Sequence, residues 1–262
     1  WMARLADGRC YWQLTLGATS SRLPARDKLA DYCAQRRRES ALVAQLFGAA
    51  AGQPASLHAR SSTAILFNEV SGSNWLRVGD AAMAVDPLSG NGIFQSLSSA
   101  LQAPAVINTL LQQPERAALA RRFHQQRVEH LFLRFARTGR EFYAMEQRWQ
   151  DHPFWRDRRN WPDNEPMHQP ADFSQVRVVR APVIRDNLID EVEVVVSADQ
   201  PLGVWHLQGI ELAPIVRQLL AGATLEHVLQ DRPLAQQQGL RAWLAAQGYP
   251  SRPQTDLQTN QH

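Results

Sequence analysis

The pattern of apolar and polar positions predicts a protein of mixed strands and helices. Alternation with a period of two favours strands, and apolar residues three or four apart favour helices. The expected strands are 10–19, Thr63–Phe67, Trp75–Val78, Val176–Val179, Glu191–Val196 and Val204–Leu207. The expected helices run from about Asp27 to Leu46, Ile93 to about Leu111, Glu115 to about Trp149, Glu211 to Leu220, Thr224 to about Gln230 and about Leu234 to Gln247. This order predicts an α/β fold class, in the sense of an α+β mix.

The most informative stretch runs from Gly79 to Ile93, between a predicted strand and a predicted helix. Asp80 places a carboxylate at the strand end, where it can accept hydrogen bonds from a polyol. Pro87 starts a Pro-x-x-Gly-x-Gly turn whose glycines, Gly90 and Gly92, can take positive φ and let a ligand approach the backbone. The helix that follows concentrates about half a positive charge at its first N–H groups. The stretch therefore predicts a site for a flat or anionic ligand at a helix N-terminus.

This combination resembles the second FAD motif of the flavin monooxygenase superfamily, which includes aromatic hydroxylases, flavin-dependent halogenases and geranylgeranyl reductases. The resemblance implies that Asp80 contacts the ribityl chain of FAD and that the turn faces the isoalloxazine ring. The cofactor-binding residues that it implies are Gly79, Asp80, Pro87, Gly90, Asn91, Gly92 and Ile93. The alternative is a glycine-rich turn with no ligand. Met83 stands where hydroxylases of this group often carry His, which puts any one subfamily in doubt.

The nucleotide-binding fingerprint of such flavoproteins, Gly-x-Gly-x-x-Gly, does not occur in this sequence. Because the chain also begins at Trp1, we expect it to be the C-terminal part of a longer protein. The resemblance then implies the C-terminal part of a glutathione-reductase-type FAD-binding fold with its substrate-domain sheet. A self-sufficient protein that lost its nucleotide-binding half is the alternative.

The resemblance, together with a change in composition at 151–175, divides the chain into five expected regions. They are part of a substrate-side sheet domain (1–74), the second FAD motif with long helices (75–150), a linker (151–175), a small winged-helix-like module (176–248) and a disordered tail (249–262). The alternative for 151–175 is a lid over a substrate entrance. Within the first region, Trp12, Gln13 and Thr15 either point toward a pocket or form a solvent-facing side of a strand, and we favour solvent.

The function expected from the resemblance is that of an FAD-dependent monooxygenase that hydroxylates an aromatic substrate. The C-terminal module suggests a peptide- or carrier-bound substrate, such as a tryptophan side chain. The alternatives are a flavin-dependent halogenase, for which Lys28 is a poor candidate for the expected lysine, and a non-catalytic binding protein that keeps the fold. The electron donor is NAD(P)H or a separate flavin reductase. No residue stands out as a catalytic base, and Asp86 is interpreted as capping the turn before Pro87.

Composition argues against several other classes of protein. The net charge is +3 and almost all of the positive charge is arginine, spread along helices without an aromatic reading module, so nucleic-acid binding is not expected. No apolar run approaches the roughly 18 residues of a membrane span, so no membrane partner is expected. Cys10 and Cys33 have no metal spacing and are expected to be reduced thiols of a cytoplasmic protein without a metal site. His124 and His130 are expected to be ordinary core or surface residues.

Overall fold

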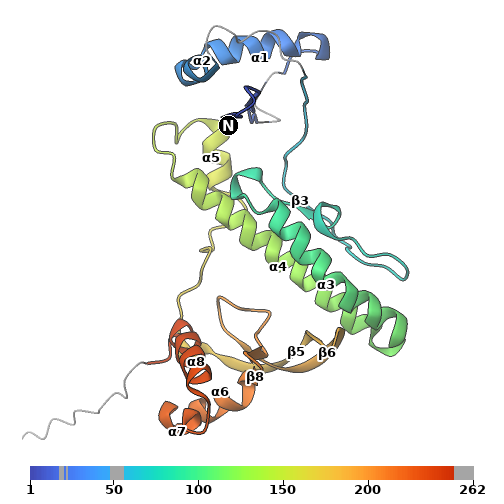
Figure 1. Cartoon of the computed structure of the whole chain (residues 1–262), viewed down its shortest axis with the longest axis vertical. Coiled ribbons are helices and arrows are strands. Elements are labelled where there is room, and N and C mark those ends of the chain that lie inside the picture. The colour runs from blue at the N-terminus through green and yellow to red at the C-terminus, as the bar shows by residue number, and fades with distance from the viewer. Residues whose placement is uncertain (18–20, 22, 48–55, 251–262) are drawn as a thin grey trace, which may run out of the picture.

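The computed structural model describes residues 1–17, 21, 23–47 and 56–250 (Figure 1). A pair of long helices crosses the middle of the molecule, with short N-terminal elements at one end and a group of strands and helices at the other. Most of the tail expected at 249–262 lies outside the described residues. Tyr249 is described, and its ring packs edge-on against that of Phe173 at 4.8 Å between centroids.

The central pair consists of α3 (Gly92–Gln112) and α4 (Ala117–Ala144), joined by the short 3₁₀ helix η5 (Pro114–Arg116). Both helices were predicted, and α3 continues through Pro104. The α4 helix ends before the predicted Trp149 because the chain turns back into α5 (Pro153–Arg159). That turn brings α5 aromatic rings against Tyr143 of α4, with the ring of Trp155 5.7 Å away.

The N-terminal elements are smaller than the sequence predicts. The strand expected at 10–19 is β2 (Cys10–Trp12), paired antiparallel with the unpredicted β1 (Met2–Arg4), and residues 18–20 lie outside the described residues. The single helix expected from Asp27 to Leu46 is wrong: η1 (Arg26–Lys28) leads into α1 (Leu29–Arg38), and α2 (Ala41–Phe47) follows. The break is explained by Ser40, whose hydroxyl accepts a hydrogen bond from the Val43 N–H at 3.3 Å and so begins a new helix.

The strand expected at Trp75–Val78 is also wrong. Residues 70–77 instead form a tight turn in which the Arg77 N–H donates to the Val70 carbonyl at 2.8 Å, so backbone groups are satisfied locally. Within the described residues this segment contributes one isolated bridge, between Ser71 and Leu76. The strand predicted at Thr63–Phe67 shortens to β3 (Ile65–Leu66), which pairs antiparallel with the unpredicted β4 (Met83–Ala84).

The C-terminal elements follow the sequence more closely. The two expected strands lengthen into a hairpin of β5 (Arg177–Arg185) and β6 (Leu188–Val196), turning at Asp186 and Asn187 with φ of 49° and 59°. Two residues with positive φ are the requirement of a tight hairpin turn, and Asp and Asn tolerate it. The expected pairing of 204–207 with 191–196 is reduced to one bridge, Val195 to Val204, because β7 (His206–Leu207) pairs with β8 (Ile210–Glu211).

Three predicted helices complete this end: α6 (Leu212–Leu220), α7 (Leu225–Leu229) and α8 (Leu234–Ala246). The Thr224 hydroxyl caps α7, as the sequence predicted, by accepting from the His227 N–H at 3.3 Å. All sheets of the described residues are two-stranded, so the expected substrate-domain sheet is represented by pairs of short strands. The protein is therefore a mix of helices and small sheets.

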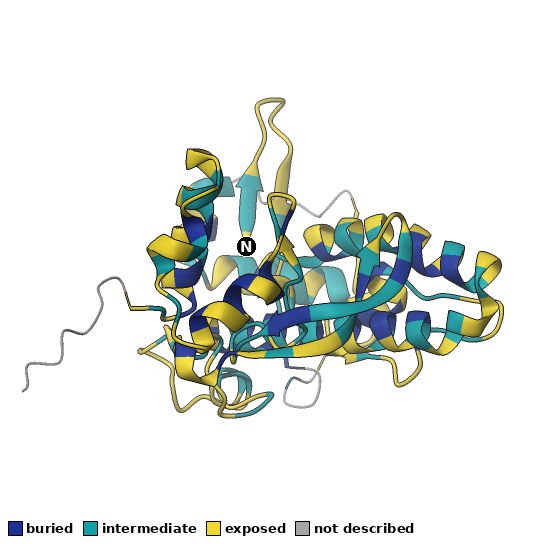
Figure 2. Cartoon of the chain, turned by 90° about the horizontal axis from the view of Figure 1, so that it is seen from below, coloured by how far each residue is buried: buried dark blue, intermediate teal, exposed yellow. Residues whose placement is uncertain are grey.

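Three apolar clusters hold these elements together, and Figure 2 shows the buried residues along the inward faces of the helices and strands. One lies within the C-terminal elements around Leu212, Leu240 and Leu244. The second joins α4 to the β3–β4 region and contains Met83, which is fully buried. The third joins α3 and α4 to β6 through Ile189. No helix of the described residues is long and apolar enough to cross a membrane.

Candidate flavin and substrate site

The stretch from Gly79 to Ile93 wraps around the N-terminus of α3. Two short 3₁₀ helices form it, η3 (Gly79–Ala81) and η4 (Pro87–Ser89). Gly79 has a φ of +57° and its N–H donates to Ser99 of α3 at 2.8 Å; a Cβ there would meet the Ser96 hydroxyl at 3.1 Å. The glycine is therefore needed both for its conformation and for the close approach of η3 to α3.

The two glycines of the turn differ in their roles. Gly90 ends η4 with a φ of +67°, as predicted. Gly92 does not use the positive φ that is open to glycine, because it is the first residue of α3 and takes a helical conformation. A Cβ added at either glycine would meet no atom within 4 Å, so open space lies beside both. The turn thus leaves its backbone accessible to a ligand.

The polar groups around this helix end are free to bind a ligand. Asp80 is exposed, and within the described residues its carboxylate makes no hydrogen bond or ion pair. The Asn91 side chain does not cap α3 but donates to the Ser89 carbonyl at 2.7 Å. The first N–H groups of α3 therefore keep their hydrogen-bonding capacity and the positive end of the helix dipole. Ile93, next in the chain, is 79% exposed.

Asp86, at the start of the turn, has a partner that the sequence did not reveal. Its Oδ1 accepts from the Leu88 N–H at 2.9 Å, which confirms the predicted capping role. Both carboxylate oxygens also lie within hydrogen-bonding distance of the Tyr143 hydroxyl of α4, at 3.1 and 3.0 Å. Burial and, next, the negative charge of Asp86 raise the pKa of Tyr143 well above its usual range, so this hydroxyl stays protonated and donates.

A large cavity opens beside the Asp86–Tyr143 pair, with a volume of about 1340 Å³. Its walls come from residues 9–16, from α1, from residues 56–64 and from the facing sides of α4 and α5. Figure 1 shows α1, the N-terminal strands and α5 at the same end of the molecule, although α1 and α5 are far apart in the sequence. Six aromatic residues line it: Tyr11, Trp12, Tyr32, Phe47, Tyr143 and Trp161. Such a wall suits an apolar, flat substrate group.

The structure places two sets of residues differently from the sequence-based expectations. Trp12, Gln13 and Thr15, expected to face solvent, all line the cavity. From the segment expected to be a linker, Asp157, Arg158 and Trp161 line it as well. The Arg158 guanidinium lies over the Phe154 ring of the same helix, 3.8 Å from its centroid, and over the Tyr143 ring of α4 at 5.7 Å, which joins α5 to α4. Local patterns carry no signal for these contacts, since the opposing walls are distant in sequence.

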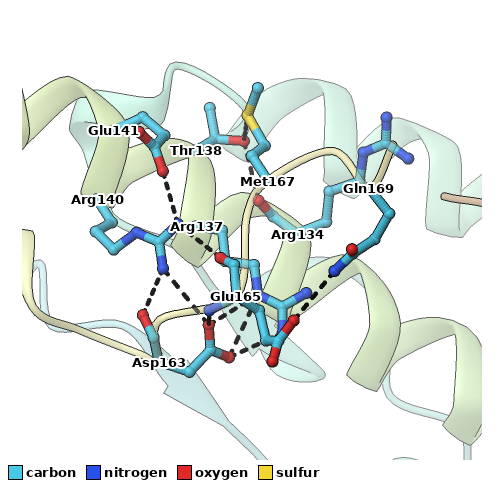
Figure 3. A network of polar contacts seen from close by, with 9 residues as sticks. All are labelled: Arg134, Arg137, Thr138, Arg140, Glu141, Asp163, Glu165, Met167 and Gln169. Carbon is cyan, nitrogen blue, oxygen red and sulfur yellow. Dashed lines mark hydrogen bonds and ion pairs between the residues drawn. The ribbon is translucent and has the colours of Figure 1, made fainter. Parts of the chain in front are cut away.

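A polar network fastens the segment after α5 to α4 (Figure 3). Arg137 donates to both oxygens of Asp163, with Nε–Oδ1 at 3.0 Å and Nη2–Oδ2 at 2.9 Å, and thereby holds the pKa of that carboxyl below its usual value. Arg140, which is buried, donates to the carbonyls of Asp163 and Glu165 and pairs with Glu141 at 2.6 Å. The network holds the cavity wall formed by α4 and Trp161 together.

The two histidines of α4 are structural. The side chain of His124 is buried, and its Nε2–H donates to the Arg77 carbonyl at 2.8 Å, which assigns the proton to Nε2. Burial lowers the pKa of both His124 and His130. No group of three or more His, Cys, Asp or Glu in the described part of the chain is arranged to hold a metal ion.

Comparison with solved structures finds two similar proteins. The first is described as the peptidyl tryptophan dihydroxylase QhpG, essential for tryptophylquinone cofactor biogenesis; it is 65% identical, with a TM-score of 0.82, over 95% of this chain and 57% of that chain. The second is CmlS, a flavin-dependent halogenase, at 15% identity and a TM-score of 0.60, over 86% of this chain and 52% of that one. No protein-family profile matches the chain, and no curated protein does.

The chain thus spans little more than half the length of either protein. The likeness to CmlS shows the fold alone, whereas the likeness to QhpG extends to the sequence. Both neighbours are of the kind that the Gly79–Ile93 motif indicated, so the resemblance to the FAD-dependent monooxygenase and halogenase superfamily is confirmed.

Proposed function

We propose that this chain belongs to an FAD-dependent monooxygenase that hydroxylates a peptide-bound tryptophan. The observation that carries the proposal is the 65% identity to a peptidyl tryptophan dihydroxylase over 95% of the chain. The TM-score of 0.82 shows that the fold is shared as well. The motif around α3 and the aromatic cavity beside it support the same function independently.

The residues around the N-terminus of α3 fit a flavin. Asp80 offers a carboxylate with no other partner among the described residues, which suits the hydroxyls of a ribityl chain. The helix end offers N–H groups and partial positive charge to the electron-rich edge of the ring. Gly90 and Gly92 leave room beside the backbone for a flat ring system. FAD, when bound, supplies the redox and oxygen chemistry, and the protein supplies binding, orientation and electrostatics.

The cavity fits the substrate part of the proposal. At about 1340 Å³ it is larger than the roughly 300–1,000 Å³ typical of small-molecule pockets, which agrees with an aromatic side chain carried on a peptide. Its aromatic lining packs against an indole ring and keeps water from it. The C-terminal elements, expected to form a winged-helix-like module, are proposed to hold the peptide or carrier that bears the tryptophan.

The electron donor of the proposed reaction is NAD(P)H or a separate flavin reductase, and a cytoplasmic location is proposed with it. A halogenase and a non-catalytic binding protein that keeps the flavoprotein fold are the competing hypotheses. No specific contact of the structure favours either of them, because the likeness to the halogenase CmlS shows the fold alone.

The test uses the complete protein that contains this chain, purified and compared with its Asp80→Ala variant. We expect wild type to carry the absorption bands of a bound flavin, and Asp80→Ala to bind FAD roughly ten- to a hundredfold more weakly through loss of a charged acceptor. Asp231→Asn is the matched control, because Asp231 is an exposed carboxylate between α7 and α8. Equal FAD retention by wild type and Asp80→Ala would refute the assignment of Asp80.

Activity is then measured with a tryptophan-containing peptide, oxygen and either electron donor. A mass gain of one or two oxygen atoms on tryptophan supports the proposal. Incorporation of chlorine from added chloride would favour the halogenase. A protein that stays colourless after FAD is added would favour the binding protein.

A further inference from the structure

The Asp86 carboxylate stands where the flavin-loop turn meets the aromatic cavity. It directly precedes Pro87, the first residue of the turn, and it lines the cavity together with Tyr143. The two side chains come from segments 57 positions apart and are joined by hydrogen bonds of 3.1 and 3.0 Å. Within the described residues, Asp86 forms no direct ion pair, and its carboxylate is held by hydrogen bonds from the Leu88 N–H and the Tyr143 hydroxyl.

The pair has acceptor capacity to spare. An ionised carboxylate offers about four lone-pair sites, and a phenol offers one proton and two lone pairs. The Leu88 N–H and the Tyr143 hydroxyl both approach Asp86, and among the described residues Oδ2 accepts from Tyr143 only. The Tyr143 proton is committed to Asp86, and the phenol oxygen interacts with the Arg158 guanidinium, so the spare acceptor sites belong to the Asp86 carboxylate. The pair can therefore accept a hydrogen bond from an O–H group of a ligand. A ring C–H in the same place would form no such bond.

The neighbouring helix face keeps the approach to this pair clear. Gly139 lies one helical turn before Tyr143 on α4 and also lines the cavity, as does Ala136. A Cβ at Gly139 would lie 3.8 Å from the Asp86 Cβ, in van der Waals contact, and would occupy space beside this side chain. Glycine in the middle of a helix costs roughly 0.5–1 kcal/mol relative to alanine. The lower helix stability at Gly139 is explained if a ligand occupies the space that the absent side chain leaves.

We propose that Asp86 and Tyr143 form a hydroxyl-binding subsite, which receives the hydroxyl group of an aromatic ring that has already been hydroxylated once. The inference rests on the proposed function and deepens it. A bare indole ring presents no O–H to Asp86, whereas a hydroxyindole donates to it and is turned to a fixed orientation. The subsite therefore retains the once-hydroxylated side chain in the cavity and positions it for a second hydroxylation.

The first arm of the test measures binding to the complete, flavin-loaded protein without oxygen. The probes are two peptides of one sequence that carry tryptophan or hydroxytryptophan. In wild type we expect the hydroxylated peptide to bind more tightly. Asp86→Asn, which keeps an oxygen for the Leu88 N–H, is expected to weaken the hydroxylated peptide about tenfold or more and to leave the other peptide unchanged. Tyr143→Phe is expected to act in the same direction and more weakly.

The second arm measures products with oxygen and an electron donor. Both variants are expected to accumulate singly hydroxylated peptide at the expense of the doubly hydroxylated one, while FAD content stays at the wild-type level. Gly139→Ala raises the helix propensity of α4 and adds a methyl group beside Asp86. It is expected to shift the product ratio in the same direction. The control is Asp151→Asn, which removes an exposed carboxylate that lies outside both the cavity lining and the C-terminal elements.

The outcomes separate the subsite from the proposed function. Equal weakening of both peptides, or an unchanged affinity ratio and product ratio in all three variants, overturns the subsite and leaves the proposed function standing. A wild-type protein that binds FAD but neither peptide overturns both. Selective weakening of the hydroxylated peptide with retained FAD establishes the subsite.

Discussion

The two ends of the molecule bury their apolar residues in opposite ways. In the C-terminal elements, Leu212, Val216 and Leu240 are fully buried in a cluster made almost entirely by that region. In the N-terminal elements, Leu42 is 61% exposed and Leu23 is 55% exposed, although the composition there is no less apolar. One end has a core of its own, and the other arranges its apolar side chains around a cavity and on its surface.

This difference separates the parts that maintain the fold from the parts that bind. A cluster of fully buried residues gives the C-terminal elements stability that does not depend on a ligand. The N-terminal wall leaves apolar surface facing the cavity, and a molecule bound there would remove that surface from water. The proposed flavin loop and the Asp86–Tyr143 pair lie at the boundary between the wall and the central helices.

The largest expected effect sharpens this contrast directly. Leu240→Ala removes a fully buried side chain of α8 and should destabilise the C-terminal elements by about 2–5 kcal/mol, from lost burial and the cavity left behind. Leu42→Ala, at an exposed position of α2, should change stability by no more than about 0.5 kcal/mol. Hydrogen exchange resolved by segment measures both in the same protein. Comparable destabilisation by the two variants would contradict the division of the molecule.

A smaller effect is expected at the junction between α4 and the segment after α5. Asp163→Asn removes the charge that Arg137 grips with two hydrogen bonds, and should weaken local stability by about 1–3 kcal/mol, toward the low end because both side chains are partly exposed. Arg137 depresses the pKa of Asp163. The stabilisation is therefore present at pH values above about 3.9, the pKa of this carboxyl in the unfolded chain. It is lost as the pH falls through the lower pKa of the folded state.

Hydrogen exchange in residues 160–170 reports this change, with peptides from α8 as an internal reference. We expect exchange to become faster in residues 160–170 and to stay unchanged in the α8 peptides. Faster exchange in both would mean that the network stabilises the whole molecule and not the cavity wall alone.

The smallest effect is expected from His124, in the central helices that both ends share. Burial lowers the pKa of this histidine, so the unfolded chain binds the proton more readily than the folded one. The contribution of neutral His124 to stability is full above about pH 6.5, the pKa of histidine in the unfolded chain. It is lost as the pH falls through the lower pKa of the folded state. Urea denaturation between about pH 5 and 7 should show this slope, and His124→Gln should reduce it. An unchanged slope would assign the titration to another group, with His130 the first to test.

Local sequence patterns predicted the parts of the fold that are stabilised locally. The helices α3, α6, α7 and α8 were placed to within about two residues, because the signals that define them are local: apolar spacing, the Thr224 cap of α7, and Gly222 and Gly248 after α6 and α8. The strand predicted just before the motif was wrong because strand formation depends on a partner elsewhere in the chain. Trp75–Val78 has strand composition, but pairing requires a neighbour, and here the backbone of Arg77 bonds to Val70.

The candidate site divides in the same way. The sequence by itself determined the turn, the carboxylate and the helix N-terminus of the stretch from Gly79 to Ile93, since these are set by residues within fifteen positions. Tertiary structure alone decided the cavity, the aromatic wall from residues 9–16 and α5, and the bond between Asp86 and Tyr143. Those features depend on which faces of distant helices and strands pack together. That outcome is set by the shape and burial of whole elements, and no short pattern of residues encodes it.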